Sequence, residues 1–217
     1  MTRRLSAALL IVLGLGTEIA QAVTFTVPST ADSGVGTLRN AISLANTTPG
    51  ADTIAFNISG TGVHTITPST PLPTITEAVT IDGYTQSGSS MNTLANGDNA
   101  VLRIELNGAS AGGTAKGLTI MAGNSTVRGL VINRFASSGI ECNTNGNNVI
   151  TGNFIGTNTA GTSALGNGLG VVVSSGSNNT VGGTTPATRN VISGNLGTGV
   201  GIFDGSSTGN LVGGPSP

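Results

Sequence analysis

A hexapeptide that occurs twice restricts the fold of this chain more than any other feature. NVITGN at 148–153 returns as NVISGN at 190–195, with threonine exchanged for serine. In steps of 23 along the chain, aliphatic residues recur at one position, and they are Ile58, Ile81, Ile104, Val127, Ile150 and Val173. Shorter steps continue the series to Ile192 and Val212. Such a period is typical of a solenoid whose coils stack on one another.

Glycine and asparagine follow the aliphatic residues of both hexapeptides. Gly152 and Gly194 stand where a positive φ lets the chain turn. Asn153 and Asn195 come next, and we expect them to hydrogen-bond locally or to a neighbouring coil in amide ladders. We therefore predict an all-β parallel solenoid in which the aliphatic series forms one inward-facing column. A sandwich of short antiparallel strands is the alternative, but it predicts no fixed repeat length.

A short helix is expected before the repeats. Thr37 is suited to cap its N-terminus, and Pro49 and Gly50 are expected to end it. The apolar residues that share one face of this helix are Leu38, Ala41, Ile42 and Ala45. We assign 23–60 to an N-terminal strand and helix cap of the solenoid, and 61–217 to its coils.

Charge is scarce along the chain. The 217 residues include 8 Lys and Arg and 9 Asp and Glu, which gives a formal net charge of −1. Binding to nucleic acid requires clustered positive charge, so we expect no nucleic-acid partner. Cys142 is the only cysteine, which excludes an intrachain disulfide. We expect Cys142 to be a small core or turn residue.

The N-terminal segment 1–22 has the pattern of a secretory signal peptide. Arg3 and Arg4 precede an apolar run over 5–16, and the small residues Ala20 and Ala22 mark a cleavage site. The apolar run is shorter than the roughly 20 residues that a membrane-spanning helix needs. We therefore predict cleavage after Ala22, no retained transmembrane helix, and a secreted, periplasmic or cell-surface protein.

Several segments resemble a known family. GTLRNAISLAN, ADTIAFNISG, LPTITEAVTIDGYTQ, NNTVGG and NVISGN are similar to segments of bacterial exported right-handed parallel β-helix proteins of the pectate-lyase-like superfamily. The resemblance implies a right-handed single-stranded β-helix with a helix-capped N-terminal entry. NLVGGPSP begins a second copy of NNTVGGTTPATRNVISGN and stops, so we expect further downstream coils of the same chain. Because this fold carries many activities, the resemblance does not fix function.

Three charged residues each follow a member of the aliphatic series. Asp82, Glu105 and Arg128 are expected to point outward from three successive coils. The two carboxylates would then lie about 5 Å apart, the separation that retaining glycosidases use. Such a pair raises one pKa or requires a cation such as Ca²⁺, and Arg128 would neutralise Glu105 or bind an acidic sugar. The alternative is a solvated row of charges.

Lyases of the resembling family use acidic residues for Ca²⁺ and a basic residue to abstract a proton. On that basis Asp82, Glu105 and Arg128 are the candidate catalytic residues. Sugar rings often stack on aromatic faces, so Tyr84, two residues after Asp82, is a candidate substrate-binding residue, and Arg103 is another. The sequence lacks the paired-aspartate signature of polygalacturonases and the arginine-flanked proline motif of pectate lyases. The only histidine, His64, stands in a threonine-rich segment and is expected to be structural.

Three interpretations follow from these patterns. The first is an exported non-catalytic scaffold, a segment of a cell-surface or adhesin-like protein that contacts polysaccharide or a cell-surface glycan. The second is a polysaccharide lyase or glycoside hydrolase acting on acidic glycans. The third is a carbohydrate-binding module without turnover. No cofactor is expected, except Ca²⁺ under the lyase interpretation. The sparse charge and the missing motifs favour the scaffold.

Overall fold

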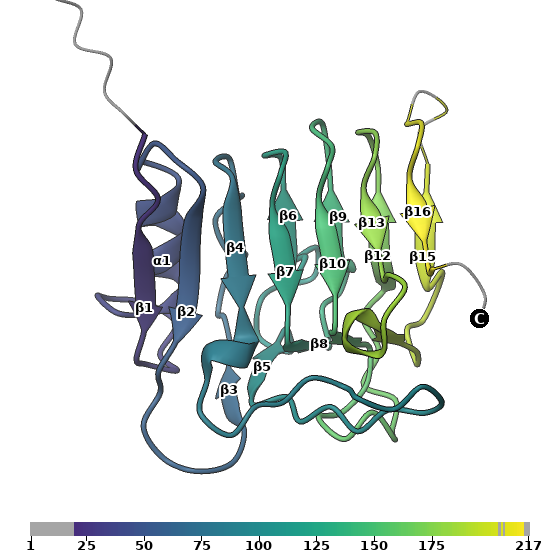
Figure 1. Cartoon of the computed structure of the whole chain (residues 1–217). Coiled ribbons are helices and arrows are strands. Elements are labelled where there is room, and N and C mark those ends of the chain that lie inside the picture. The colour runs from purple at the N-terminus through teal and green to yellow at the C-terminus, as the bar shows by residue number, and fades with distance from the viewer. Residues whose placement is uncertain (1–19, 204, 206, 215–217) are drawn as a thin grey trace, which may run out of the picture.

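The computed structural model of the protein describes residues 20–203, 205 and 207–214 (Figure 1). Its strands form three sheets, and all strand pairs within these sheets are parallel. The arrangement is compatible with a β-solenoid and is not closed into a barrel. Most of the predicted signal peptide, residues 1–19, lies outside the described residues.

Sheet A runs along the whole stack and forms the row of strands that lie side by side in Figure 1. Its seven strands are β1 (Thr24–Val27), β2 (Asp52–Phe56), β4 (Val79–Asp82), β7 (Thr126–Arg128), β10 (Val149–Thr151), β13 (Thr180–Val181) and β16 (Leu211–Val212).

Sheets B and C complete the sides of each coil. Sheet B contains β3 (His64–Ile66), β5 (Ile104–Asn107), β8 (Leu130–Asn133), β11 (Phe154–Ile155) and β14 (Val191–Ile192). Sheet C contains β6 (Leu118–Ile120), β9 (Ser138–Cys142), β12 (Leu169–Val173) and β15 (Val200–Ile202). From β4 onward the chain visits sheets A, B and C in turn and then returns to A, so each coil has three sides.

The expected single aliphatic column is wrong in register. Ile81, Val127 and Ile150 do stack in sheet A. Ile104, however, pairs with His64 and Leu130 in sheet B. The other displaced members are Ile58, which follows β2, Val173, which pairs in sheet C, and Ile192, which pairs in sheet B. The members of the series from Ile58 to Val173 are nonetheless buried, so their inward orientation is confirmed.

The misplaced register has a simple origin in coil length. Asp82 and Arg128 are register partners in sheet A although they stand 46 positions apart in the sequence, twice the expected step. The additional residues of this coil form the segment 83–103 between β4 and β5, whereas in the next coil only Gly129 separates β7 from β8. A constant step of 23 therefore placed Ile104 at the midpoint of this long coil, on a different sheet.

The expected helix is present as α1 (Leu38–Ala45), at the N-terminal end of the stack (Figure 1). Thr37 caps it by accepting a hydrogen bond from the Asn40 amide at 3.2 Å. Its four predicted apolar residues are buried in the main core. The helix ends at Ala45, before Pro49. Its C-cap residue, Asn46, joins it to a neighbouring segment: the Asn46 side chain donates to the Thr74 carbonyl at 2.7 Å and accepts from the Thr76 amide at 2.8 Å.

Asparagine ladders occupy the three corners of the coils. Asn148 stacks on Asn179 between sheets C and A, with 2.9 Å between the amide Nδ2 and Oδ1. Asn153 stacks on Asn190 between sheets A and B, and Asn167 on Asn195 between sheets B and C. The prediction of amide ladders is confirmed.

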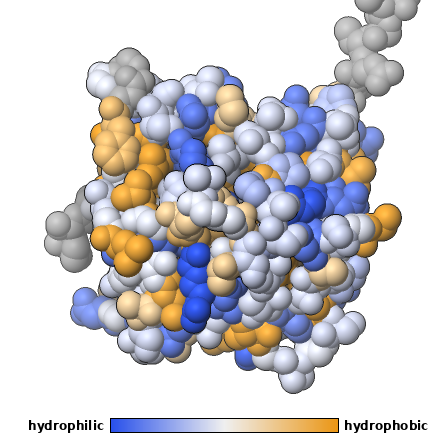
Figure 2. All heavy atoms as spheres, turned by 180° about the vertical axis from the view of Figure 1, so that it is seen from behind, coloured by the Kyte–Doolittle hydropathy of each residue, from blue (hydrophilic) through white to orange (hydrophobic). Residues whose placement is uncertain are grey.

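The two ends of the stack differ in how their core is covered. At the N-terminal end, α1 packs its apolar face into the core. At the other end, Leu211 and Val212 are about half exposed, and Phe203 is 63% exposed. Figure 2 shows hydrophobic residues gathered on this C-terminal side, at the left of the view. Among the described residues, no helix is long and apolar enough to span a membrane.

Candidate functional site

Asp82 and Arg128 form an ion pair at the carboxyl end of sheet A. They are register partners on β4 and β7, and the Arg128 Nη2 atom lies 2.6 Å from Asp82 Oδ2. Asp82 also caps the short 3₁₀-helix η1 (Gly83–Thr85) by accepting from the Tyr84 amide at 3.0 Å. The Asp82 side chain is 9% exposed, and that of Arg128 is 40% exposed. The carboxylate is therefore neutralised and already hydrogen-bonded.

Glu105 does not join this pair, and the expected stack of three charges on successive coils is wrong. Glu105 lies on β5 in sheet B, whereas Asp82 and Arg128 lie in sheet A. Its Oε2 accepts from the Thr65 hydroxyl at 2.6 Å, and its Oε1 accepts from Asn133 Nδ2 at 2.8 Å. The cause is again the long coil, which puts Arg128 directly beside Asp82.

Arg103 lies two residues before Glu105, and alternation along an extended segment puts both on the same face. Its Nε donates to the Gly88 carbonyl at 3.3 Å, and its side chain is partly exposed. We name Thr65, Arg103, Glu105 and Asn133 the Glu105 cluster. Thr65, Arg103 and Glu105 place a hydroxyl, a guanidinium and a carboxylate on this outer face, and the buried Asn133 amide donates to Glu105.

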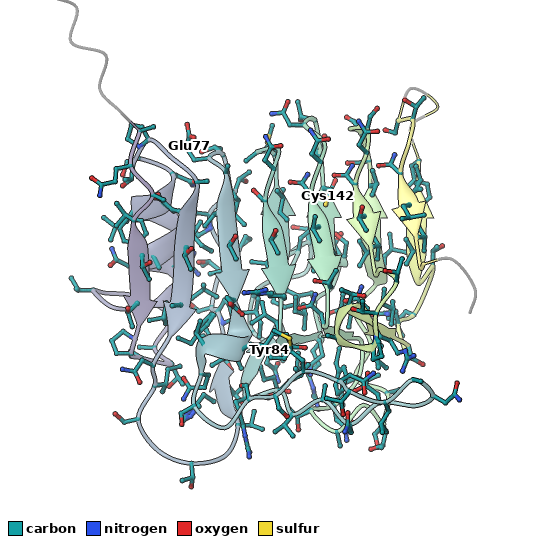
Figure 3. All side chains as sticks on the ribbon, in the orientation of Figure 1. Glu77, Tyr84 and Cys142 are labelled. Carbon is teal, nitrogen blue, oxygen red and sulfur yellow. The ribbon has the colours of Figure 1, made fainter. Side chains whose placement is uncertain are left out.

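Tyr84 is held in place by packing. Its ring lies against a small cluster of Leu102, Val131 and Phe154, and its hydroxyl donates to the Gly152 carbonyl at 2.8 Å. Figure 3 labels Tyr84 near the carboxyl ends of the sheet A strands. Burial, together with the nearby aspartate charges, raises the pKa of Tyr84 to about 12. The ring therefore has a structural function in joining the inserted segment to the coils.

The residues proposed for Ca²⁺ do not fit a cation site. Asp82 is neutralised by Arg128, and Glu105 lies on another sheet. The described part of the chain contains no group of three or more His, Cys, Asp or Glu side chains that could hold a metal ion. Ca²⁺ prefers six to eight oxygen ligands, and this arrangement does not supply them.

The sequence patterns did not predict the ion pair between Lys116 and Glu141. Lys116 Nζ pairs with Glu141 Oε2, and the Ser174 hydroxyl donates to Glu141 Oε1 at 3.0 Å. Glu141 is 7% exposed and lies on β9 in sheet C. The neighbouring Cys142 is buried in the core, as expected, and burial with the Glu141 charge raises its thiol pKa to about 12. The step of 23 gives no signal for this pair, because it does not align Lys116 with Glu141.

Comparison of the chain with protein-family models, with curated proteins and with solved structures gave no match.

Proposed function

We propose that the protein is an exported, non-catalytic scaffold with the fold of a right-handed single-stranded parallel β-helix. The cyclic order of sheets A, B and C supports the β-helix. Right-handedness is supported by the strong general preference of parallel strand connections for that hand. The family resemblance carries the proposal of a bacterial cell-surface or adhesin-like protein.

One observation carries the non-catalytic part of the proposal. Asp82, Glu105 and Arg128 do not converge, because they lie on two sheets and Asp82 is already paired with Arg128. Acid–base catalysis needs groups that meet at one reacting bond. The Asp82 carboxylate is already occupied by a guanidinium and a backbone amide, so it is poorly placed to act on a substrate.

Contact with polysaccharide is best supported at the Glu105 cluster. Thr65 is exposed and Arg103 and Glu105 are partly exposed, so these three side chains offer donors and acceptors suited to sugar hydroxyls, whereas Asn133 is buried. Stacking of a sugar on Tyr84 has less support, because the ring packs on Leu102 and Phe154. We propose weak binding of glycans through hydrogen bonds.

Export is the remaining part of the proposal. The charged start, the apolar run and the small residues before Val23 favour a cleaved signal peptide. The protein would then be secreted, periplasmic or attached at the cell surface.

Further coils of the same chain are proposed to stack on the C-terminal end. A cavity of about 530 Å³ there is lined by Val181, Ile192 and Val200 of the last full coil and by Val212 of β16. β16 extends sheet A by one strand beyond this coil. A following coil would bury these side chains, as stacking neighbours do in solenoids.

Titration with acidic and neutral oligosaccharides tests the proposed function. We expect weak binding that Glu105→Gln and Arg103→Ala both reduce, without release of reducing ends or unsaturated sugars. Glu77→Gln is the matched control, because Glu77 is exposed and lies at the opposite, amino end of sheet A (Figure 3). Cleavage products that disappear in Glu105→Gln would instead establish the lyase or hydrolase interpretation.

A further inference from the structure

Asp52 is a buried carboxylate with one oxygen unpaired. It is the first residue of β2 and is 1% exposed, on the same side of the strand as the core residues Ile54 and Phe56. Its Oδ1 accepts from the Val23 amide at 2.8 Å. Its Oδ2 is buried and has no hydrogen-bond partner among the described residues. Burial of a polar atom without a hydrogen-bond partner costs free energy of folding.

The equivalent positions in later coils are neutral. Asp52 belongs to the column at the corner between sheets C and A, where side chains accept the backbone N–H of the preceding coil. The later acceptors are Ser125, Asn148, Asn179 and Asn210, at 2.8 to 3.2 Å from the nitrogens that they accept from. Asn148 and Asn179 also use their second polar atom as a donor to backbone carbonyls. Asp52 has the same position with a negative charge added.

The donor to Asp52 is the residue that the predicted cleavage would expose. Hydrolysis of the Ala22–Val23 bond by a signal peptidase consumes one water, leaves a carboxylate on Ala22 and leaves an α-ammonium on Val23. An ammonium has three N–H groups, whereas a peptide nitrogen has one. We propose that Asp52 is a built-in receptor for the new N-terminus, and that the Val23 ammonium binds both of its carboxylate oxygens. The inference rests on the export proposed above.

The surroundings of Val23 suit this change. The flanking residues 20–22 are exposed, and β1 begins at Thr24, so the cut bond lies just outside the strand. The Val23 carbonyl accepts from the Thr53 amide at 2.8 Å, which keeps Val23 beside Asp52 after cleavage. Cleavage therefore converts a buried carboxylate that faces one amide into a charge pair with strong hydrogen bonds.

The test compares one preparation before and after a cut. The full chain is made with a site-specific protease sequence in place of the residues just before Val23, so that cutting leaves Val23 first. We expect cutting to raise the folding equilibrium constant about tenfold or more, in line with hydrogen bonds between charged groups. Asp52→Asn should abolish this gain. In the uncut chain Asp52→Asn should be neutral or stabilising, because Asn148 and Asn179 already accept a backbone N–H at the same position of later coils.

A cut one residue earlier, which leaves Ala22 first, is the matched control and should give no gain. Amine labelling adds a second readout, because Lys116 is the only lysine and serves as the internal standard. The paired α-amine should react more slowly in the cut chain than in its Asp52→Asn variant. Equal stability of cut and uncut chains, or a gain that survives Asp52→Asn, would overturn the pairing.

N-terminal sequencing of the exported protein tests the premise separately. Val23 as the first residue supports the inference, and another first residue overturns it. Neither result depends on glycan binding, so failure of the proposed scaffold function remains distinguishable.

Discussion

The hexapeptides NVITGN and NVISGN differ in one side chain, yet they form strands of two different sheets. The first supplies β10 in sheet A, where Ile150 stacks on Val127 and Val181. The second supplies β14 in sheet B, where Ile192 stacks on Ile155. The last asparagine of the first hexapeptide, Asn153, stacks on the first asparagine of the second. The hexapeptide is therefore one side of a coil with its two corners.

This comparison shows that the unit of sequence repetition is smaller than the coil. Each corner needs an asparagine that bonds to the coils before and after it, and each side needs an inward aliphatic residue. Because all three corners are built from the same contacts, the same hexapeptide can serve on different sides. The inserted loops, not the repeat, decide which side a copy occupies.

Replacing the inward isoleucine with aspartate should give the largest difference in stability loss between the two hexapeptides. Ile150 is 0% exposed, whereas Ile192 is only partly buried against the core. We expect Ile150→Asp to abolish cooperative folding, at a cost above about 4 kcal/mol, because it buries an unpaired charge. Ile192→Asp should cost about 1–2 kcal/mol, because the carboxylate reaches water. Urea denaturation followed by circular dichroism measures both, and equal costs would contradict the placement of the copies.

The last asparagine is the next most sensitive position. Asn153 is 0% exposed, accepts from the Leu130 amide at 3.0 Å and donates to the Val127 carbonyl at 2.9 Å. Asn195 makes similar bonds but is partly exposed. We expect Asn153→Ala to cost about 3 kcal/mol and Asn195→Ala about 1 kcal/mol. The backbone groups that lose their asparagine partner remain excluded from water only at Asn153. The same denaturation measurement checks this, and a larger loss at Asn195 would reverse the assignment.

Alanine at the turn glycine should cost about 2 kcal/mol in either copy, because both glycines have positive φ. The neighbours differ: a Cβ at Gly152 would lie 2.5 Å from the Tyr84 hydroxyl, and one at Gly194 would lie 2.8 Å from the Ala164 Cβ. Tyr84→Phe should therefore recover part of the loss in Gly152→Ala and none in Gly194→Ala. Double-mutant cycles from melting curves give the coupling energy between Tyr84→Phe and each glycine substitution. A coupling energy between Tyr84→Phe and Gly194→Ala would refute the contact of Tyr84 with the first hexapeptide.

Exchange of the hydroxyl residues should have the smallest effect. Thr151→Ser removes one largely buried methyl group and should cost under about 1 kcal/mol. Ser193 is exposed, so Ser193→Thr should change stability by less than about 0.5 kcal/mol. The double exchange makes the first copy NVISGN and the second NVITGN. A changed fold, detected by amide NMR shifts throughout the chain, would show that this side chain decides the sheet.

Local patterns in the sequence predicted local structure well. The helix over Leu38–Ala45 followed from the Thr37 cap and the spacing of apolar residues, and both are present. Inward aliphatic residues and corner amide ladders also followed, because each depends on contacts that neighbouring coils repeat. The orientation of a side chain is set within a few residues, so a short pattern reveals it.

Register between coils could not be predicted, because it depends on loop length. The insertion over 83–103 doubled one coil and displaced Glu105 from the Asp82–Arg128 pair. A different signal was available at the corner column. A polar residue stands two positions before the inward aliphatic residue in DTI, STV, NVI, NTV and NLV, which begin at Asp52, Ser125, Asn148, Asn179 and Asn210. The same pattern at Asn190 leads into β14 in sheet B, and β1 and β4 lack it, so the pattern marks a corner of the coil and does not identify the sheet.

Hydrogen bonds from the two hexapeptides to their neighbours test the three-sided coil most directly. NMR couplings across hydrogen bonds in the deuterated, ¹³C,¹⁵N-labelled protein identify the carbonyl that each amide binds. We predict a coupling between the Ser193 amide and the Ile155 carbonyl, which lie 3.1 Å apart, and one between the Gly182 amide and the Ile150 carbonyl, 2.9 Å apart. A coupling from Ser193 to Ile150 would place both hexapeptides on one sheet and contradict the account.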